Sequence, residues 1–265
     1  MSESSNLFAF KNNRFLFHYT SFESAVKILA SDSIRFGSFS DFNDVAENGK
    51  TIIGDGVDED EEKNIQELFS HYYSISFTKD SKMARGFALE TQWGYYGDNG
   101  RGVCLVLNKK TLRKAFRKQF GKNAIKFDRI KYIHTRTATS FCGRREVNKE
   151  ISRFNKECIE DLYFEKNRIW RHEKEYRMLI YSMSYPTYLL LNSDDIIAVI
   201  TYCKARSLDK IPKNTEYKAL LKIVGKDKMF RLLDSMGAMT IVNDSNQTVW
   251  TDSFYAEDAP LSIEL

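Results

Sequence analysis

The chain carries many short strand patterns, and helical patterns separate them at irregular intervals. Tyr73–Thr78 alternates Tyr, Ile and Phe with Ser, Ser and Thr, as a strand does when one face is buried and the other is lined with hydroxyls. Gly102–Leu107 is almost entirely apolar and is typical of a buried strand. Because strands and helices do not alternate strictly, we predict an α+β fold with a mixed or split β-sheet and flanking helices.

The first strand and the first helix are predicted to follow one another directly. Arg14–Tyr19 is the strand, and the apolar spacing after it predicts a helix over Thr20–Ser31. Thr20 and Glu23 have the spacing of a capping box, so we expect the helix to begin at Thr20. The further predicted strands or extended segments are Ser33–Phe39, Glu175–Tyr181, Ile196–Tyr202 and a terminal hairpin of Met239–Val242 with Gln247–Trp250. The further predicted helices are Glu61–Tyr72, Ser81–Gln92, Val147–Asn167 and a stretch within Lys218–Met236.

Composition indicates one globular body. The chain has 265 residues, of which 42% are hydrophobic, with only three prolines and no Gly/Ser-rich linker, so we predict a single compact domain over residues 1–265. No apolar run approaches the roughly 18 residues of a membrane span, and the N-terminus lacks the blocks of a signal peptide. The four cysteines have no metal-ligand spacing, so we expect a cytoplasmic protein with reduced thiols and no bound metal.

Positive charge is concentrated in one segment. Residues 109–131 contain ten Lys or Arg against the single acid Asp128. One interpretation is a surface helix docked on the core by its apolar stripe. The other is a surface for nucleic-acid phosphates or for an acidic protein partner. The cations of that surface would be Lys110, Arg113, Lys114, Arg117 and Lys118.

Two places combine polar side chains with strand ends. His18 precedes a predicted helix N-terminus, where backbone amides favour a polar or anionic ligand. The alternative is a core histidine bonded to a nearby carbonyl, which is the more common case for such a pattern. If a strand begins near Glu173, its period of two puts Glu173, Glu175 and Arg177 on one face. Such a row is either an exposed ladder of charges or a functional cluster at the mouth of a buried strand.

Several motifs occur in an order that resembles one bacterial family. They are HYTSFESAVKIL, IRFGSFSDFNDVAE, YSISFTKD, YGDNGRGVCLVL, EKEYRMLIY and DIIAVITY. The sequence from about residue 15 to about residue 202 is similar to the domain of unknown function 2971 family, and residues 203–265 would form a C-terminal extension of helix and strand. Val45 and Tyr202 depart from the family pattern, which has proline and glycine near these places.

The order of motifs also resembles that of ADP-ribosyltransferase-like folds, which include DNA ADP-ribosyltransferases of the DarT type and RNA 2′-phosphotransferases. The resemblance implies that NAD is the cofactor and that a late strand supplies a glutamate. It implies catalytic roles for Glu175, Glu173 and His18. It implies that the cofactor is bound by His18, Tyr19, Thr20, Ser74, Ser76, Thr78 and Arg177. An aromatic ring such as Tyr19, Trp93 or Tyr96 can stack on nicotinamide or adenine. We also expect Asn43 to border the cleft, because its loop follows His18 by one helix and one short strand.

This chemistry suits these residue types, because breaking the nicotinamide–ribose bond develops positive charge that a carboxylate stabilises. The resulting hypothesis is an NAD-dependent enzyme that modifies a nucleic acid or protein, as a toxin or an anti-phage effector. A catalytically silent binding or sensor module is the first alternative. A metal-dependent nuclease is the second, with carboxylates at Asp41, Asp44, Glu47, Glu173 and Glu175.

Overall fold

The computed structural model describes residues 14–42, 60, 63, 67, 70–81, 84–134, 163–204, 215–235 and 238–253. Two compact units emerge from its contacts. Unit 1 combines residues 1–32, 79–109 and 192–265, and unit 2 combines residues 33–78 and 110–191. We describe each unit by itself, and the single domain over residues 1–265 stays a prediction.

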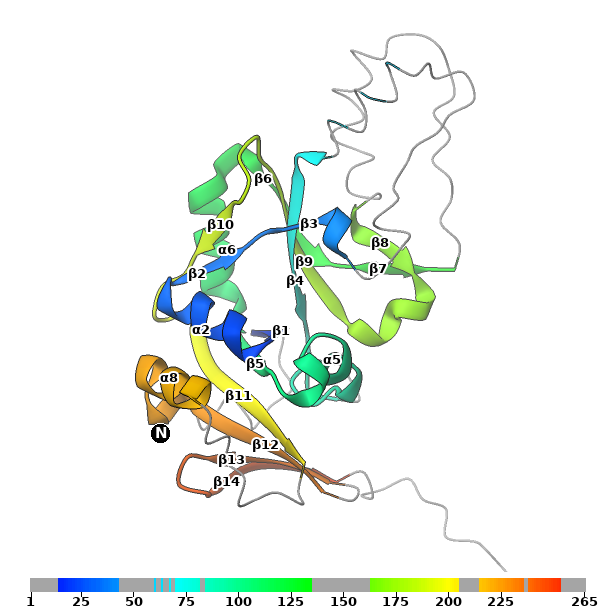
Figure 1. Ribbon diagram of the computed structural model, residues 1–265. Coiled ribbons are helices and arrows are strands. Elements are labelled where there is room, and N and C mark those ends of the chain that lie inside the picture. Colours follow the sequence, from blue (N-terminus) through cyan, green and yellow to red (C-terminus); the bar gives the residue numbers. More distant parts are fainter. Residues whose placement is uncertain are drawn as a thin grey trace, which may run out of the picture. The chain divides into compact units, whose positions relative to one another are not determined.

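Unit 1 is built on a mixed sheet with the strand order β14-β13-β12-β11-β5-β1 (Figure 1). Its strands are β1 (Phe15–Thr20), β5 (Val103–Asn108), β11 (Ile196–Lys204), β12 (Met229–Ser235), β13 (Ala238–Asn243) and β14 (Thr248–Ser253). Neighbouring strands are antiparallel except β11 and β12, which are parallel. A parallel pair needs a long connection, and helix α8 (Thr215–Val224) lies in it. The mixed sheet and the terminal hairpin predicted from the sequence are therefore confirmed.

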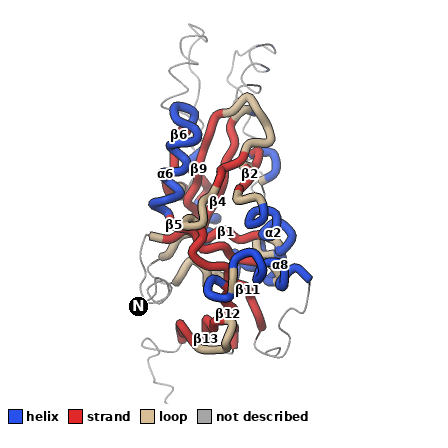
Figure 2. Tube along the Cα trace, turned by 90° about the vertical axis from the view of Figure 1, so that its left-hand side faces the viewer, coloured by secondary structure: helices blue, strands red, loops and turns tan. Residues whose placement is uncertain are grey.

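Helix α2 (Phe22–Ala30) packs against α8, and the two helices lie side by side in Figures 1 and 2. The predicted cap is wrong by one residue. Ser21 is the N-cap, and its hydroxyl accepts the backbone N–H of Ser24 at 3.2 Å. Thr20 remains in β1, because its backbone continues the antiparallel ladder opposite Val103.

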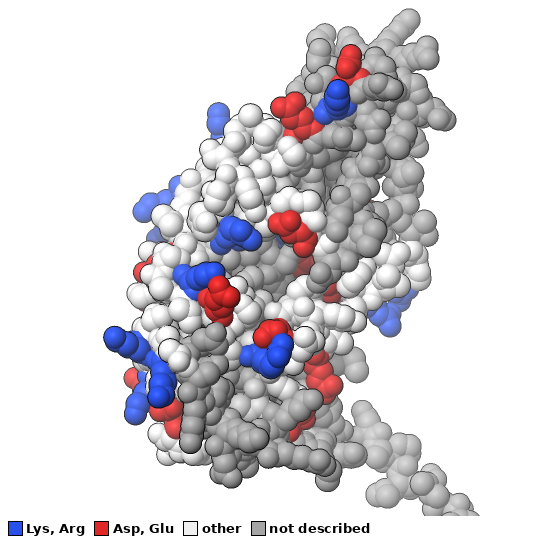
Figure 3. All heavy atoms as spheres, viewed as in Figure 1, with Lys and Arg blue, Asp and Glu red and all other residues white. Residues whose placement is uncertain are grey.

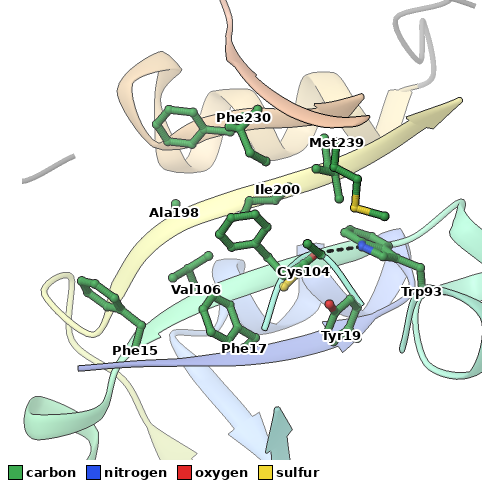
Figure 4. Close-up of a cluster of buried hydrophobic side chains, with 14 residues drawn as sticks. Phe15, Phe17, Tyr19, Trp93, Cys104, Val106, Ala198, Ile200, Phe230 and Met239 are labelled. Carbon is green, nitrogen blue, oxygen red and sulfur yellow. Dashed lines mark hydrogen bonds between the residues drawn. The ribbon is translucent and has the colours of Figure 1, made fainter. Parts of the chain in front are cut away.

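The core of unit 1 is filled by alternate residues of its strands, which point to the same face (Figure 4). They come from β1, β5, β11, β12 and β13, and they are joined by Phe87, Ala88 and Trp93. The Trp93 ring lies edge-on to Tyr19 at 5.0 Å between centroids, and its indole N–H donates to the carbonyl of Phe87 at 2.8 Å. The buried strand predicted over residues 102–107 is thus confirmed as β5.

The helix predicted over Ser81–Gln92 is wrong for most of its length. Helix α5 covers only Glu90–Tyr95, followed by the 3-10 turn η2 (Asp98–Gly100). Asp80 explains the difference, since its carboxylate accepts the backbone N–H of Gly86 at 2.8 Å and the Arg85 Nε–H at 3.1 Å. Those bonds stabilise a loop conformation, and formation of a helix would break them.

Unit 2 has its strands in the order β4-β9-β6, with β3 on the other side of β4. Its elements are β3 (Gly37–Ser38), η1 (Phe39–Asp41), β4 (Tyr72–Thr78), helix α6 (Lys109–Phe120), η3 (Gly121–Asn123), β6 (Ala124–Arg129), η4 (Arg168–Glu173) and β9 (Glu175–Tyr181). Two small sheets complete it: β2 (Ser33–Arg35) with β10 (Tyr188–Leu190), and β7 (Lys131–Ile133) with β8 (Glu165–Asn167).

Two of the predicted helices, Glu61–Tyr72 and Val147–Asn167, lie mostly outside the described residues. The end of the second is corrected, because residues 165–167 form strand β8 beside β7. The helical stretch predicted within Lys218–Met236 ends at Val224 as α8, and the remainder forms η6 (Lys226–Lys228) and β12.

In the part of the chain that the structure describes, every helix is too short or too polar to cross a membrane.

Candidate functional site

Four charged side chains gather in unit 2, and we call them the ion cluster: Lys166, Glu173, Glu175 and Arg177. Each is at most 5% exposed. The Arg177 Nε–H donates to Glu175 Oε1 at 2.7 Å, and the Lys166 ammonium lies 2.8 Å from Glu173 Oε2 and 3.5 Å from Glu175 Oε2. Two carboxylates and two cations give the cluster no formal net charge, which is the condition under which buried ions are tolerated.

The pairing of β4 with β9 places the cluster next to hydroxyl groups. Ser76 stands opposite Arg177 in the ladder, and Thr78 stands opposite Glu175. These residues share one face because strand side chains alternate. The Ser76 hydroxyl donates to Glu175 Oε1 at 2.6 Å. The predicted hydroxyl-lined face of β4 therefore does meet the glutamate of the late strand.

Glu173 reaches the same place by a different route. The strand does not begin near Glu173 as predicted, because this residue ends the 3-10 helix η4 and β9 begins at Glu175. Lys174 between them has φ +50°, a left-handed conformation that breaks the period of two. The two carboxylates are held together by Lys166 instead of by a common strand face.

Aromatic side chains and a backbone carbonyl complete the surroundings of Arg177. Its Nη1 donates to the carbonyl of Tyr163 at 2.6 Å, and its guanidinium carbon lies 5.4 Å from the ring centres of Phe39 and Phe42. Guanidinium groups are attracted to aromatic faces at such distances. Arg177 is 0% exposed, so its position is fixed by these contacts.

Tyr132 on β7 contacts the first residue of β9. Its hydroxyl accepts the backbone N–H of Glu175 at 2.9 Å. Burial raises the pKa of Tyr132 well above its ordinary value, and the nearby charge of Glu175 raises it further. The phenol therefore stays protonated and remains able to donate its own proton within the site.

 Ser76 and Thr78 lie on the cluster's side of β4, Thr78 being buried. Ser74 lies on the same face, and its buried hydroxyl has no hydrogen-bond partner among the described residues. Asn43 lies outside the described residues. Glu175 and Glu173 are 5% and 3% exposed, so depth of burial does not separate the two carboxylates.

The remaining predicted cofactor residues belong to unit 1. His18 is half-buried on β1, opposite Leu105, and Thr20 is half-buried at the end of that strand. Tyr19 and Trp93 are core residues, and the Tyr19 hydroxyl donates to the carbonyl of Gly86 at 2.6 Å. Tyr96 is partly buried against the same core. Packing accounts for the two buried rings, and the convergence of His18 with Glu175 stays a prediction.

Helix α6 divides the predicted nucleic-acid residues into two groups. Lys110, Lys114, Arg117 and Lys118 are exposed, and their spacing places them on one face of the helix. Arg113 instead turns toward the sheet of unit 2, where it donates to the Tyr176 hydroxyl at 2.7 Å. Figure 3 shows cations and acids interspersed over the described part of the face that it draws.

Lys166, Tyr132 and Tyr163 are members of the site that the sequence did not reveal. Lys166 was expected at the end of a long helix, whereas the structure places it on β8, opposite Tyr132 of β7. No local pattern distinguishes this lysine from the many exposed ones. Tyr163 was expected in that same helix, and the sequence predicts no helix or strand around Tyr132.

The carboxylates of the nuclease alternative do not form a metal site among the described residues, where no group of three or more His, Cys, Asp or Glu side chains is placed to hold an ion. Asp41 is exposed on η1, and Glu173 and Glu175 pair with Lys166. Asp44 and Glu47 lie outside the described residues.

Comparison with known proteins finds a family model that matches part of the chain, and two solved structures of low sequence identity. The family described as "Protein of unknown function (DUF2971)" matches residues 92–178, a range that contains the whole ion cluster, and the family resemblance inferred from the sequence is confirmed there. No curated protein matches the sequence. Thermus sp. 2.9 DarT in complex with ADP-ribosylated ssDNA is 15% identical with a TM-score of 0.32, covering 81% of this chain and 89% of that chain. The same protein in complex with NAD+ is 14% identical with a TM-score of 0.32, covering 83% and 92%. Scores this low carry no argument, and the site is therefore interpreted from its own side chains.

Proposed function

We propose that the ion cluster and Ser76 form the active site of an NAD-dependent enzyme that transfers ADP-ribose to a macromolecule. The observation that carries the proposal is Glu175, a carboxylate at the start of a strand whose Oε1 accepts from both Ser76 and Arg177. Replacing a buried ion network by apolar residues often leaves stability unchanged or raises it. Stability alone therefore does not explain why the chain holds four charges here, which supports a chemical role for them.

The residues present fit the ribose end of NAD. If bound here, NAD would supply the reactive nicotinamide–ribose bond, whose cleavage would develop positive charge on the ribose. A fixed carboxylate such as Glu175 stabilises that charge most strongly where water is excluded. The unpartnered hydroxyl of Ser74, on the same strand face as Ser76, is a polar group that a ribose hydroxyl would satisfy.

Each neighbour of Glu175 has a distinct task in this proposal. Arg177 fixes the orientation of the carboxylate through Oε1, because it is itself held by the carbonyl of Tyr163. Ser76 donates to the same oxygen and would exchange that bond for one with a ribose hydroxyl. Tyr132 anchors the backbone at the first residue of β9.

A nicotinamide-release assay tests the proposal, with thermal-shift titration of NAD as an independent measure of binding. We expect Glu175→Gln to reduce release by on the order of 100-fold or more, the effect of deleting one electrostatic stabiliser. Because this change also unbalances the cluster, Ser76→Ala is the companion variant, and it should weaken release with little loss of stability. If the wild-type protein neither binds NAD nor releases nicotinamide with any DNA, RNA or protein acceptor, the proposal fails.

We propose nucleic acid as the acceptor, bound by the exposed cations of α6. These are Lys110, Lys114, Arg117 and Lys118, which lie along one face of the helix. A single strand that contacts them should lose about 0.7 log units of affinity per contact for each tenfold rise in salt. Lys114→Gln should lower that slope by one contact, whereas Arg113→Gln should leave it unchanged because Arg113 binds Tyr176. Binding that is independent of salt would reject this surface.

A catalytically silent binding module is the second candidate, and the pairing of Glu175 favours it. Both carboxylate oxygens already have partners, and the residue is 5% exposed. Under this reading the cluster fixes the shape of unit 2 and performs no chemistry. NAD binding or nucleic-acid binding without nicotinamide release, unchanged in Glu175→Gln, would favour the module over the enzyme.

A further inference from the structure

Lys166 is a buried lysine with an unusual set of neighbours. Its side chain is 5% exposed, and its ammonium lies 4.9 Å from the ring centre of Trp170. The same ammonium pairs with Glu173 at 2.8 Å and with Glu175 at 3.5 Å. Burying a charged lysine away from water costs free energy, and close pairing with carboxylates offsets that cost. The position of the Lys166 ammonium is therefore set by its two carboxylate partners.

The two cations of the cluster divide the Glu175 carboxylate between them. Arg177 donates its Nε–H to Oε1 and a second N–H to the carbonyl of Tyr163. The Lys166 ammonium lies 3.5 Å from Oε2 of Glu175, whereas Ser76 and Arg177 both donate to Oε1. Since Lys166 is closer to Glu173 than to Glu175, the stronger of its two pairings is with Glu173.

Charge balance follows from this division. The Lys166 ammonium contacts both carboxylates. Without it, Glu173 and Glu175 would lose the cation that they share, and two buried carboxylates close to one another resist being ionised together. Tyr132 also contacts Glu175, and its neutral phenol cannot replace the lost charge.

We propose that Lys166 is a positioning residue that keeps Glu173 and Glu175 ionised together, with Glu173 binding the ammonium so that Oε2 of Glu175 can be released to a ligand. This inference rests on the proposed function for the use of Glu175, but its electrostatic part is independent of any activity. It assigns Glu173 a role in charge balance and not in the chemical step.

The test is a charge-matched set of variants: Lys166→Met, Lys166→Met with Glu173→Gln, and Lys166→Arg. The free energy of unfolding is measured in urea between pH 5 and pH 8, a range chosen to lie above the ordinary glutamate pKa of about 4.3. In Lys166→Met the folded state should hold one more proton than the unfolded state. Its unfolding equilibrium constant should therefore rise by up to tenfold per pH unit as the pH increases.

The double variant removes one charge of each sign and should return the pH dependence to that of the wild type. Lys166→Arg keeps the positive charge and should show no new pH dependence. If Lys166→Met shows none, or if the double variant keeps it, the inference is wrong. If Lys166→Met does not fold, folding of the double variant supports charge balance, and failure of both shows that Lys166 serves packing alone.

A second readout separates this inference from the proposed function. In an active enzyme, Lys166→Met should move the acidic limb of the pH profile of nicotinamide release to higher pH by about one unit or more, and the double variant should move it back. A wild type without nicotinamide release would refute the proposed function, while the unfolding data would still decide the role of Lys166.

Discussion

Replacing Arg177 by methionine tests whether the ion cluster is as tightly coupled as its geometry indicates. The substitution keeps an unbranched side chain but leaves Glu175 without the donor at 2.7 Å and the carbonyl of Tyr163 without the donor at 2.6 Å. Arg177 is 0% exposed, so water does not replace either bond. The cluster would also carry one uncompensated negative charge.

The magnitude follows from the cost of breaking a buried ion pair. Removing one partner of such a pair typically costs about 3–5 kcal/mol. This is a large fraction of a total stability of roughly 5–15 kcal/mol. Urea unfolding at neutral pH, followed by tryptophan fluorescence, measures it directly. Arg177→Lys should cost less, because it keeps the charge but loses the planar fork.

Two controls make the result specific. Lys131→Met removes an ion pair of the same unit, in which the lysine is 70% exposed, and should cost less than about 1 kcal/mol. Arg177→Met combined with Glu175→Gln restores neutrality, so its cost should be smaller than the sum of the two single costs by roughly 0.5–3 kcal/mol. An Arg177→Met protein no less stable than Lys131→Met, or strictly additive single costs, would refute the coupling.

Three further predictions concern other parts of the chain. Burial raises the pKa of Tyr72 to about 12, so the stability that its neutral phenol contributes is complete below pH 10 and is lost as the pH rises toward 12; Tyr72→Phe should make alkaline unfolding shallower in a pH titration. Gly102→Ala should destabilise unit 1 by about 1–3 kcal/mol in thermal or urea unfolding, because a Cβ there would lie 2.3 Å from the carbonyl oxygen of Thr20. Ser21→Ala should cost about 0.5–2 kcal/mol as the loss of a helix cap, since Ser21 accepts the N–H of Ser24, and Thr20→Ala should not reproduce that loss through capping.

The contact between Ser76 and Glu175 was within reach of the sequence because both strands show a clear period of two. Alternation in β4 put Ser76 and Thr78 on one face, and the same rule in β9 put Glu175 beside Arg177. The sequence did not say which strands are neighbours. That choice depends on the burial of whole faces, which no single segment reports.

The rest of the site could not be predicted because its determinants are not local. Glu173 enters the cluster through the left-handed conformation of Lys174, which overrides the strand period. Lys166 lies on a strand of only three residues whose partner, β7, is more than thirty residues away. In the same way, the bonds of Asp80 to Gly86 and Arg85 replace a helix that the local pattern favours.

The interleaving of the two units along the chain has a consequence for biosynthesis. All residues of unit 2 precede residue 192, whereas the sheet of unit 1 needs β11, β12 and β13 to cover the core side chains of β1 and β5. During translation, β1 and β5 are therefore synthesised well before β11, β12 and β13, the strands that complete their sheet. Pairing across such separations is slow, and exposed apolar strands are prone to aggregation in the interval. The nascent chain is thus most vulnerable between the emergence of β5 and that of β11, and this is the interval in which a chaperone would be needed.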